Sequence, residues 1–350
     1  MREHNIKIKR SKKMKKIIAL ILVLSLSLFC FAACKKDKEN NNDNNANNNE
    51  NNTPTEKTYS LAIGVDVAQD AAEVAKTVAV IVTDADGKIV SCRIDCISVT
   101  AELKDGEVDA SKTYKSKAEL KEEYGMLTNN DYYGSKLGEW YQQAQAFETY
   151  VIGKTAAEVA AIAVDNKGYP TDSTLTAGCT MGVSEFISAI GKAFASEHKV
   201  SFKTSSTFTL GASACADVTS ENGTAEYAAD FAGAVVSGGK VIAAIIDSTA
   251  ATSAISGEDF GAITYPGTKL EQGDEYGMLT NNDYYGSKLG EWYQQAEAFA
   301  KFAVGKTATE VAAIAVDSEG YPTDAALTAG CTMGIAGYKV ALEKAITYAR

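Results

Sequence analysis

The sequence predicts an α+β protein built from two tandem repeats, each a small antiparallel sheet packed with helices. One observation is an internal duplication: residues 123–183 match residues 275–335 without a gap, and 49 of the 61 positions are identical. Another is the order of patterns in each copy, because β-branched runs around turn residues come before helical spacing of apolar residues. Strands followed by helices are typical of α+β domains. We therefore place repeat 1 at residues 58–200 and repeat 2 at residues 206–350.

The chain begins with an export signal, which we place at residues 1–33. A basic segment precedes an apolar run at residues 17–33, which is shorter than the ~20 residues of a comfortable membrane span. Phe31-Ala-Ala-Cys34 resembles a bacterial lipobox, in which Cys34 would be lipidated after the signal is removed. An uncleaved N-terminal anchor is the alternative, and translation could start at Met1 or Met14. Either way, we expect a protein tethered to the extracellular face of the cell membrane.

Residues 34–57 form an Asn-rich spacer with almost no apolar side chains. Such a segment buries too little apolar surface to offset the loss of conformational entropy on ordering. We therefore expect a disordered spacer between the membrane and the repeats. The whole chain carries a net charge of −11 and the signal segment +7, which leaves −18 for the rest. A nucleic acid demands basic neutralising side chains, so this charge argues against nucleic-acid binding.

Cysteine and histidine usage argues against a metal site. Five cysteines follow Cys34 without the spacing of a zinc set, and His198 is the only histidine after the signal segment. Cys92 and Cys96 lie four apart on a predicted strand. They therefore share a face and are too far apart for a disulfide.

The first part of each repeat predicts strands. In repeat 1 these are Tyr59–Val67, Thr77–Thr83 and Lys88–Val99, with a hairpin signal at Asp84-Ala-Asp-Gly87. Repeat 2 has Gly238-Gly239 at the corresponding turn. A polar connection of uncertain structure begins at Asp105-Gly106.

The second part of each repeat predicts helices. A first helix in repeat 1 ends near Gly153, and Thr155-Ala-Ala-Glu158 is a capping box that opens a second, short helix. A turn follows at residues 164–170, and a final amphipathic helix closes the repeat. Apolar residues at helical spacing mark the first helix and the final helices: Leu137, Trp140, Tyr141, Ala144, Phe147 and Val151; then Val183, Phe186, Ile187, Ile190 and Phe194; and Ile335, Tyr338, Leu342 and Ile346.

One stretch occurs in both copies before the final helix, as Asp172-Ser-Thr-Leu-Thr-Ala-Gly-Cys-Thr180-Met and as Asp324-Ala-Ala-Leu-Thr-Ala-Gly-Cys-Thr332-Met. The glycine permits close backbone approach and unusual φ. We expect the last threonine at or just before a helix N-terminus, where free N–H groups favour a phosphate. No base stands beside this threonine in the sequence, so an outside enzyme would have to attach a phosphate there.

This stretch resembles the attachment motif of FMN-binding domains, in which a flavin transferase couples FMN phosphate to a threonine. The resemblance implies Thr180 and Thr332 as acceptors, with Gly178, Gly330, Asp172 and Asp324 matching other motif positions. The first hydroxyl residue of the motif is replaced here by Ala177 or Ala329. Thr176 and Thr328 lie one residue before that position. With the signal, spacer and repeats, the chain resembles the flavinylated lipoproteins of Gram-positive extracellular electron transfer. That implies a redox carrier rather than an enzyme, a membrane quinone-linked electron donor and an extracellular acceptor.

Other readings stay open. Thr180 could be only an N-cap and Asp172 a loop acid. The protein could instead bind a small solute non-covalently, or act as a structural surface module. Aromatic candidates for stacking on a flavin are Trp140, Tyr132, Tyr133 and Tyr141, although Trp140 and Tyr141 fit the core and the other two fit a loop. Lys136 and Lys154 are candidates for the phosphate or solvated surface residues.

Overall fold

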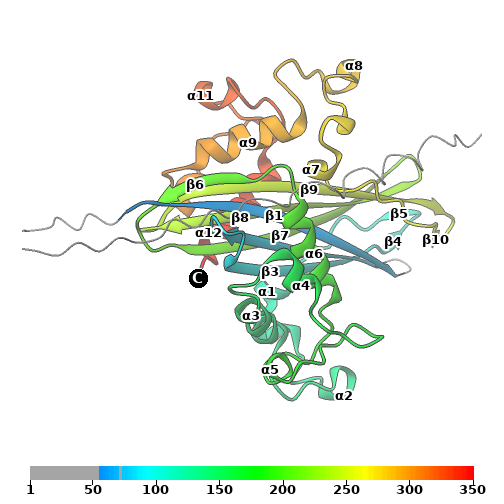
Figure 1. The fold of residues 1–350 in the computed structure, drawn as a ribbon. Helices are drawn as coiled ribbons and strands as arrows, with labels where there is room; N and C mark the ends of the chain where they lie inside the picture. Colours follow the sequence, from blue (N-terminus) through cyan, green and yellow to red (C-terminus); the bar gives the residue numbers. More distant parts are fainter. Residues whose placement is uncertain (1–54, 71–72) are drawn as a thin grey trace, which may run out of the picture. The chain divides into compact units, whose positions relative to one another are not determined.

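The computed structural model describes residues 55–70 and 73–350 (Figure 1). The predicted signal segment, Cys34 and nearly all of the predicted spacer lie outside these residues. Residues 54–350 form one compact unit that contains both predicted repeats. Within the described ranges, no helix is long and apolar enough to cross a membrane.

Two four-stranded antiparallel sheets form the centre of this unit, in the orders β3-β2-β1-β6 and β10-β9-β8-β7. The first contains β1 Lys57–Asp70, β2 Glu73–Thr83, β3 Ile89–Thr100 and β6 Val200–Thr204. The second contains β7 Thr209–Glu221, β8 Thr224–Ser237, β9 Lys240–Ser256 and β10 Asp259–Phe260. A hairpin of two short strands, β4 Leu103–Lys104 and β5 Glu107–Val108, lies at Asp105-Gly106, where the sequence predicted only a polar connection.

Helices follow the strands in each half of the chain. The first half has α1 Lys117–Leu120, η1 Lys121–Tyr124, α2 Asn130–Tyr133, α3 Trp140–Tyr150, α4 Ala156–Ala160, α5 Ser173–Thr176 and α6 Ser184–Ala195. The second half has α7 Lys269–Gln272, η2 Gly273–Tyr276, α8 Asn282–Tyr285, α9 Trp292–Ala303, α10 Ala308–Ala312, α11 Ala325–Thr328 and α12 Ala336–Thr347. The predicted α+β class, with antiparallel sheets packed with helices, is confirmed.

Several local predictions hold and two are wrong. The capping box at Thr155 opens α4, since Glu158 N donates to Thr155 Oγ1 at 3.4 Å and Thr155 N donates to Glu158 Oε2 at 2.8 Å. Cys92 and Cys96 are free thiols, as expected, and both are buried. Leu137 precedes α3 rather than lying on it, because Glu139 is the residue that caps this helix. Tyr133, expected in a loop, lies in the short helix α2 together with Tyr132.

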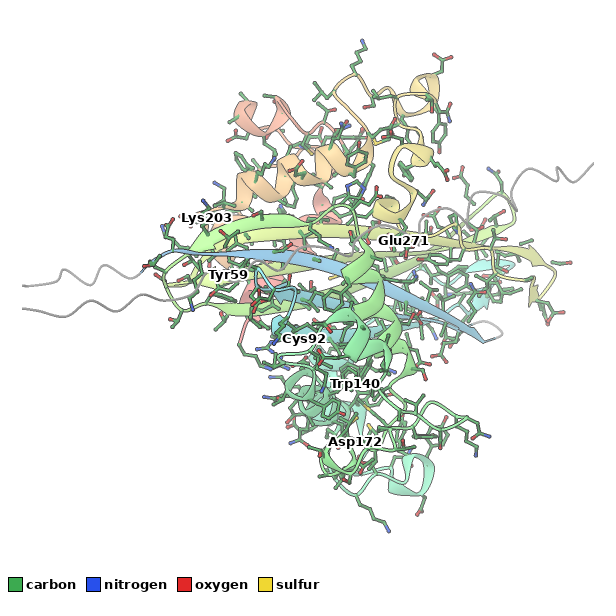
Figure 2. All side chains as sticks on the ribbon, viewed as in Figure 1. Tyr59, Cys92, Trp140, Asp172, Lys203 and Glu271 are labelled. Carbon is green, nitrogen blue, oxygen red and sulfur yellow. The ribbon has the colours of Figure 1, made fainter. Side chains whose placement is uncertain are left out.

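Each sheet is covered on both faces. On one face of the first sheet, Ile81 and Ile94 pack with Phe147 and Phe186 of its helices. Figure 2 places Trp140 and Asp172 among these helices. The other face packs against the second sheet, and a Cβ on Gly233 would meet Val80 Cγ1 at 2.6 Å. The strands therefore carry apolar residues on both sides, as strands of a four-layer arrangement must.

The two halves contact each other reciprocally. Lys192 of α6 pairs with Glu271 of α7 at 3.1 Å, and Lys344 of α12 pairs with Glu119 of α1 at 2.7 Å. Each residue of the first pair lies 152 positions from its counterpart in the second, so the same two patches meet twice, as in a two-fold interface. These ion pairs are partly exposed and contribute little energy, so the shared apolar face holds the sheets together.

The final helix of each half lies very close to the first strand of its own sheet. A Cβ added to Gly64 of β1 would collide with the backbone of Ala189 and Ala193 in α6. We expect Gly64→Ala to lower the free energy of unfolding by about 1–3 kcal/mol because the backbone itself must move. Gly191→Ala is the matched control: it lies in α6 with open space around it and should raise stability by about 0.5–1 kcal/mol. Urea unfolding checks both, and equal effects would contradict this close approach.

Lys76 is a fully buried lysine of β2 whose ammonium donates to the Tyr227 carbonyl oxygen of the second sheet. Burial lowers its pKa to about 7, although Asp230 and Glu226 act in the opposite direction. Because an exposed lysine in the unfolded chain has its ordinary higher pKa, the unfolded state binds the extra proton between these values. Stability therefore rises with pH across this window.

We expect Lys76→Met to remove this dependence. The free energy of unfolding, measured with urea at several pH values, should increase between pH 7 and pH 10 in the wild type. This increase should exceed that of the variant by on the order of 1–4 kcal/mol. The same pH dependence in both proteins would show that Lys76 is charged in the folded state throughout the window. Comparison with the variant cancels the titration of tyrosines and cysteines.

Candidate functional site

In each half, the repeated threonine stretch forms a short helix, α5 or α11, and the loop that follows it. Asp172 is the N-cap of α5, and its Oδ1 accepts from Thr174 N at 2.8 Å and Leu175 N at 3.2 Å. These bonds lower the pKa of Asp172. The next helix, α6, begins only at Ser184, four positions after Thr180. The prediction that Thr180 lies at a helix N-terminus was therefore wrong, and so was its alternative role as an N-cap.

A buried glutamine holds each threonine in place. Thr180 N donates to Gln143 Oε1 at 2.8 Å, and the Thr180 hydroxyl lies 3.3 Å from the same oxygen. Gln143 Nε2 donates in turn to Ser135 Oγ and to the Gly138 carbonyl oxygen, both at 3.0 Å. In the second half, Gln295 makes the corresponding contacts with Thr332 at 2.8 and 3.3 Å. Both threonine side chains remain exposed, so their hydroxyls are accessible from solvent.

The glycine of the motif serves close packing. A Cβ on Gly178 would meet Ala146 Cβ of α3 at 2.8 Å, and one on Gly330 would meet Ala298 Cβ of α9 at 2.9 Å. Neither glycine has a positive φ, so the expected unusual φ was wrong while the expected close approach is present. The next residue, Cys179 or Cys331, is fully buried, and burial raises the pKa of each thiol to about 11.

Beside Thr332 lies a cavity of about 370 Å³. Five of its twelve lining residues are aromatic, and one lysine is the only charged side chain among the lining residues described: Lys269, Tyr276, Met278, Tyr285, Gly286, Ser287, Trp292, Tyr321, Thr332, Met333, Gly334 and Tyr338. This volume is in the range of about 300–1,000 Å³ that is usual for ligand pockets. The exposed threonine hydroxyl and these aromatic side chains therefore belong to one site.

Lys269 and Tyr338 contact each other and the neighbouring aromatic side chains of the cavity. Lys269 Nζ lies 3.1 Å from Tyr338 Oη, which also accepts from Trp292 Nε1 at 3.1 Å. The same ammonium lies 5.4 Å from the Trp292 ring centroid and 5.3 Å from that of Tyr276. Burial raises the pKa of Tyr276 to about 12, although Lys269 opposes the shift. At neutral pH the site thus offers a fixed cation among flat, uncharged rings.

In the first half of the chain, the residues 152 positions earlier are of the same types except at the position of Tyr338. Lys117 Nζ lies 5.3 Å from the Tyr124 ring centroid and 5.9 Å from that of Trp140. Phe186 takes the position of Tyr338 and meets Trp140 edge to face, with ring centroids 5.8 Å apart. The lysine in repeat 1 therefore lacks the phenol oxygen that Lys269 contacts.

Several predicted site residues lie outside the Thr332 cavity. Asp324 caps α11, and the Thr328 hydroxyl lies 3.3 Å from the Ala325 carbonyl oxygen. Neither they nor Gly330 line the cavity, and their counterparts Asp172, Thr176 and Gly178 have the same local roles in the first half of the chain.

Some of the aromatic and lysine candidates correspond to residues that line the Thr332 cavity, and others lie outside it. Trp292 and Tyr285, the counterparts of Trp140 and Tyr133, line the Thr332 cavity. Tyr132 is 78% exposed, and Tyr141 Oη donates to Glu122. Lys136 is exposed, and Lys154 lies over the Tyr150 ring at 4.4 Å.

Gln143, Gln295, Lys117 and Lys269 were not predicted as site residues from the sequence. The sequence did contain a signal for Gln143. It lies between Trp140 and Phe147 on the apolar side of a helix, so its amide is buried. A buried amide must find partners, which marks it as a residue that fixes another segment.

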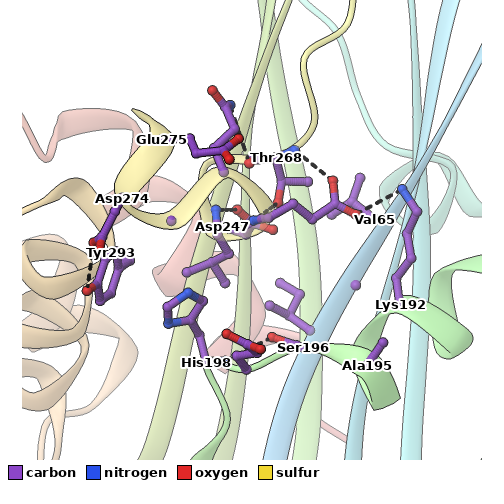
Figure 3. A pocket seen from close by; sticks show the side chains of 17 residues that line it. Val65, Lys192, Ala195, Ser196, His198, Asp247, Thr268, Asp274, Glu275 and Tyr293 are labelled. Carbon is purple, nitrogen blue, oxygen red and sulfur yellow. Dashed lines mark hydrogen bonds and ion pairs between the residues drawn. The ribbon is translucent and has the colours of Figure 1, made fainter. Parts of the chain in front are cut away.

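A larger cavity, of about 520 Å³, lies elsewhere, between β1, β9 and α7 (Figure 3). His198 stacks there on Tyr293 with ring centroids 4.5 Å apart, and Asp274 accepts from the Tyr293 hydroxyl at 3.1 Å. None of the predicted site residues lines it. Within the described part of the chain, no group of three or more metal-ligating side chains could hold an ion.

Comparisons of the chain with protein-family models, with curated proteins and with solved structures gave no match. The geometry of the site and the motif resemblance are therefore the basis for a functional proposal.

The glutamine anchor gives a direct test of how the threonine turn is held. Gln143→Leu leaves the Thr180 amide without its acceptor, so we expect a loss of about 1–3 kcal/mol in unfolding free energy. Hydrogen exchange at the Thr180 amide should also become faster. Gln145→Leu, on the exposed side of α3, should change neither quantity. Unchanged protection of Thr180 in Gln143→Leu would show that another group holds the turn.

Proposed function

We propose that this protein is a membrane-tethered, extracellular electron-transfer lipoprotein with FMN joined covalently to Thr180 and to Thr332. In this proposal it consists of two tandem repeats that follow a lipoprotein signal peptide and a disordered spacer. It is a redox carrier and not an enzyme. A membrane quinone-linked donor supplies electrons, and an acceptor outside the cell removes them.

The observation that carries the proposal is the placement of the exposed Thr332 hydroxyl at an aromatic cavity that also contains a lysine. Each part fits one part of FMN. Tyr276 and Tyr285 offer ring faces for an isoalloxazine ring, Lys269 offers a cation, and the hydroxyl offers an oxygen for a phosphoester. The position of Thr332 in the sequence motif agrees with this use.

Among the residues that the structure describes, no catalytic base contacts either threonine hydroxyl. The Thr180 and Thr332 hydroxyls contact a glutamine amide oxygen, which does not take up a proton at neutral pH. Attachment therefore needs a separate flavin transferase and an activated donor such as a flavin dinucleotide. The threonine oxygen forms the new bond to phosphorus, a nucleoside monophosphate leaves, and the transferase accepts the hydroxyl proton.

Once bound, FMN would supply the electron-transfer chemistry, and the protein would supply orientation and electrostatics. Gln143 and Gln295 hold the attachment turns, and the aromatic residues shield the ring from water. The spacer would let the domains reach a donor at the membrane and an acceptor beyond it.

Intact-protein mass spectrometry under denaturing conditions tests this function. The sample is the exported protein, produced with a flavin transferase that modifies a known acceptor in the same cells. We expect two FMN phosphoryl groups in the wild type, one each in Thr180→Ala and Thr332→Ala, and none in the double variant. Thr176→Ala and Thr328→Ala are matched controls and should keep both groups.

Two other results would count against the proposal. Retention of two groups in the double variant would place the flavin on other residues. An unmodified wild type, in cells where the known acceptor is modified, would favour the non-covalent binding or structural readings.

A further inference from the structure

The helical layer of each half contains an exposed segment that is identical in the two copies. Residues 123–144 recur unchanged 152 positions later, and eleven of the described residues in the first copy are exposed. Tyr132 is 78% exposed, as is its counterpart Tyr284, and Leu137 and Leu289 are 49% and 48% exposed. Exposed aromatic and apolar side chains that gather in one segment are typical of surfaces that contact another molecule.

The identity stops at both ends of this segment. Immediately before it, Lys121 and Glu122 correspond to Gly273 and Asp274. Immediately after it, residues 145–183 differ from their counterparts at twelve positions, and eight of these positions are exposed. Exposed residues outside the segment have therefore diverged between the copies. Folding places little demand on exposed side chains, so the identity inside the segment calls for a requirement other than folding.

Hydrogen bonds connect the segment to the threonine in the first half. Gln143 Nε2 donates to Ser135 Oγ at 3.0 Å, and Gln143 Oε1 accepts from Thr180 N at 2.8 Å. Ser135 lies between the exposed Tyr132 and Leu137 in the sequence. A molecule bound to these two side chains is therefore close to the Thr180 hydroxyl.

The second half shows the same proximity through its cavity. Tyr285 lines the cavity beside Thr332, and the exposed ring of Tyr284 meets that of Tyr285 edge to face, with ring centroids 4.9 Å apart. The exposed part of the segment thus continues directly from the threonine site.

The occupant of this surface has to act at both threonines. A flavin transferase must reach each hydroxyl, whereas an electron donor or acceptor needs to reach only one of the two flavins. The exposed residues just before the threonines do not offer equal contacts, because Ser173 and Thr174 are replaced by Ala325 and Ala326. The identical segment offers the same contacts at both sites.

We propose that the exposed segment 123–144 and its copy 275–296 are the surfaces on which the flavin transferase docks. Tyr132 and Leu137 are the apolar anchors in the first half, and their counterparts are the anchors in the second. This inference rests on the proposed flavin attachment. It makes the anchors specificity-determining residues that contact the transferase, while the threonine alone receives the flavin.

The test changes one copy of the surface and uses the other copy as an internal control. The exported protein, made in cells without a transferase, is incubated with a purified flavin transferase and flavin adenine dinucleotide. Mass spectrometry follows FMN on the Thr180 and Thr332 peptides over time. With Tyr132→Ala and Leu137→Ser combined, we expect the initial rate at Thr180 to fall at least about tenfold, as loss of a binding hot spot would cause. The rate at Thr332 should stay unchanged.

Two further variants complete the design. Tyr284→Ala combined with Leu289→Ser should slow attachment at Thr332 alone. Ile152→Ser is the matched control, since Ile152 is 46% exposed just after α3 and differs from its counterpart Val304. It should leave both rates unchanged. An unchanged urea midpoint, together with a normal rate at the second threonine, separates lost docking from misfolding.

Normal rates at both threonines in both double variants would overturn the inference while leaving the flavin carrier intact. Normal attachment with slower reduction of the flavins by a quinone-linked donor would assign the surface to a redox partner, and would overturn it as well. A wild type that accepts no flavin, with a transferase that modifies a known acceptor, would overturn the carrier and the inference with it.

Discussion

The apolar residues on both faces of each sheet constrain the rest of the structure. One face of the first sheet is covered by α6 and α3, and the other face packs on the second sheet, where Val80 meets Gly233. Because the inner faces are used against each other, each half has only its outer face for helices. The threonine turns belong to those outer helical layers, on opposite sides of the sheets in Figure 1, where α5 and α11 are labelled. Each site can therefore be reached without opening the shared core.

Buried polar side chains on one helix build each site. Glu139, at the start of α3, accepts from Met126 N at 2.7 Å and from Leu127 N at 3.0 Å, and Gln143 one turn later holds Thr180. An unpaired buried amide or carboxylate would be costly, so these side chains fix two loops relative to one rigid helix. The second half repeats this arrangement with Glu291 and Gln295. The reactive hydroxyl thus owes its position to residues far away in the sequence.

Local patterns predicted the strands and the capped helix α4 because the interactions concerned lie within a few residues. The start of α6 was placed too early, since Thr180 looks like a cap but its amide is used by Gln143, 37 residues away. Likewise, β6 pairs with β1 across about 140 residues, and Lys269 meets Tyr338 across 69. Such contacts depend on how the helices pack on the sheets, which residue spacing does not specify. The signal segment, the lipid anchor and the flavin remain predictions from the sequence.

We propose that the Thr332 hydroxyl holds a flavin against the aromatic side chains of its cavity. A crystal structure of the exported protein, purified from cells that contain a flavin transferase, tests this most directly. We expect continuous electron density from Thr332 Oγ1 through a phosphate to an isoalloxazine ring in contact with Tyr276 or Tyr285. A free Thr332 hydroxyl beside a cavity that holds only water, in a preparation where a known acceptor protein is flavinylated, would contradict it.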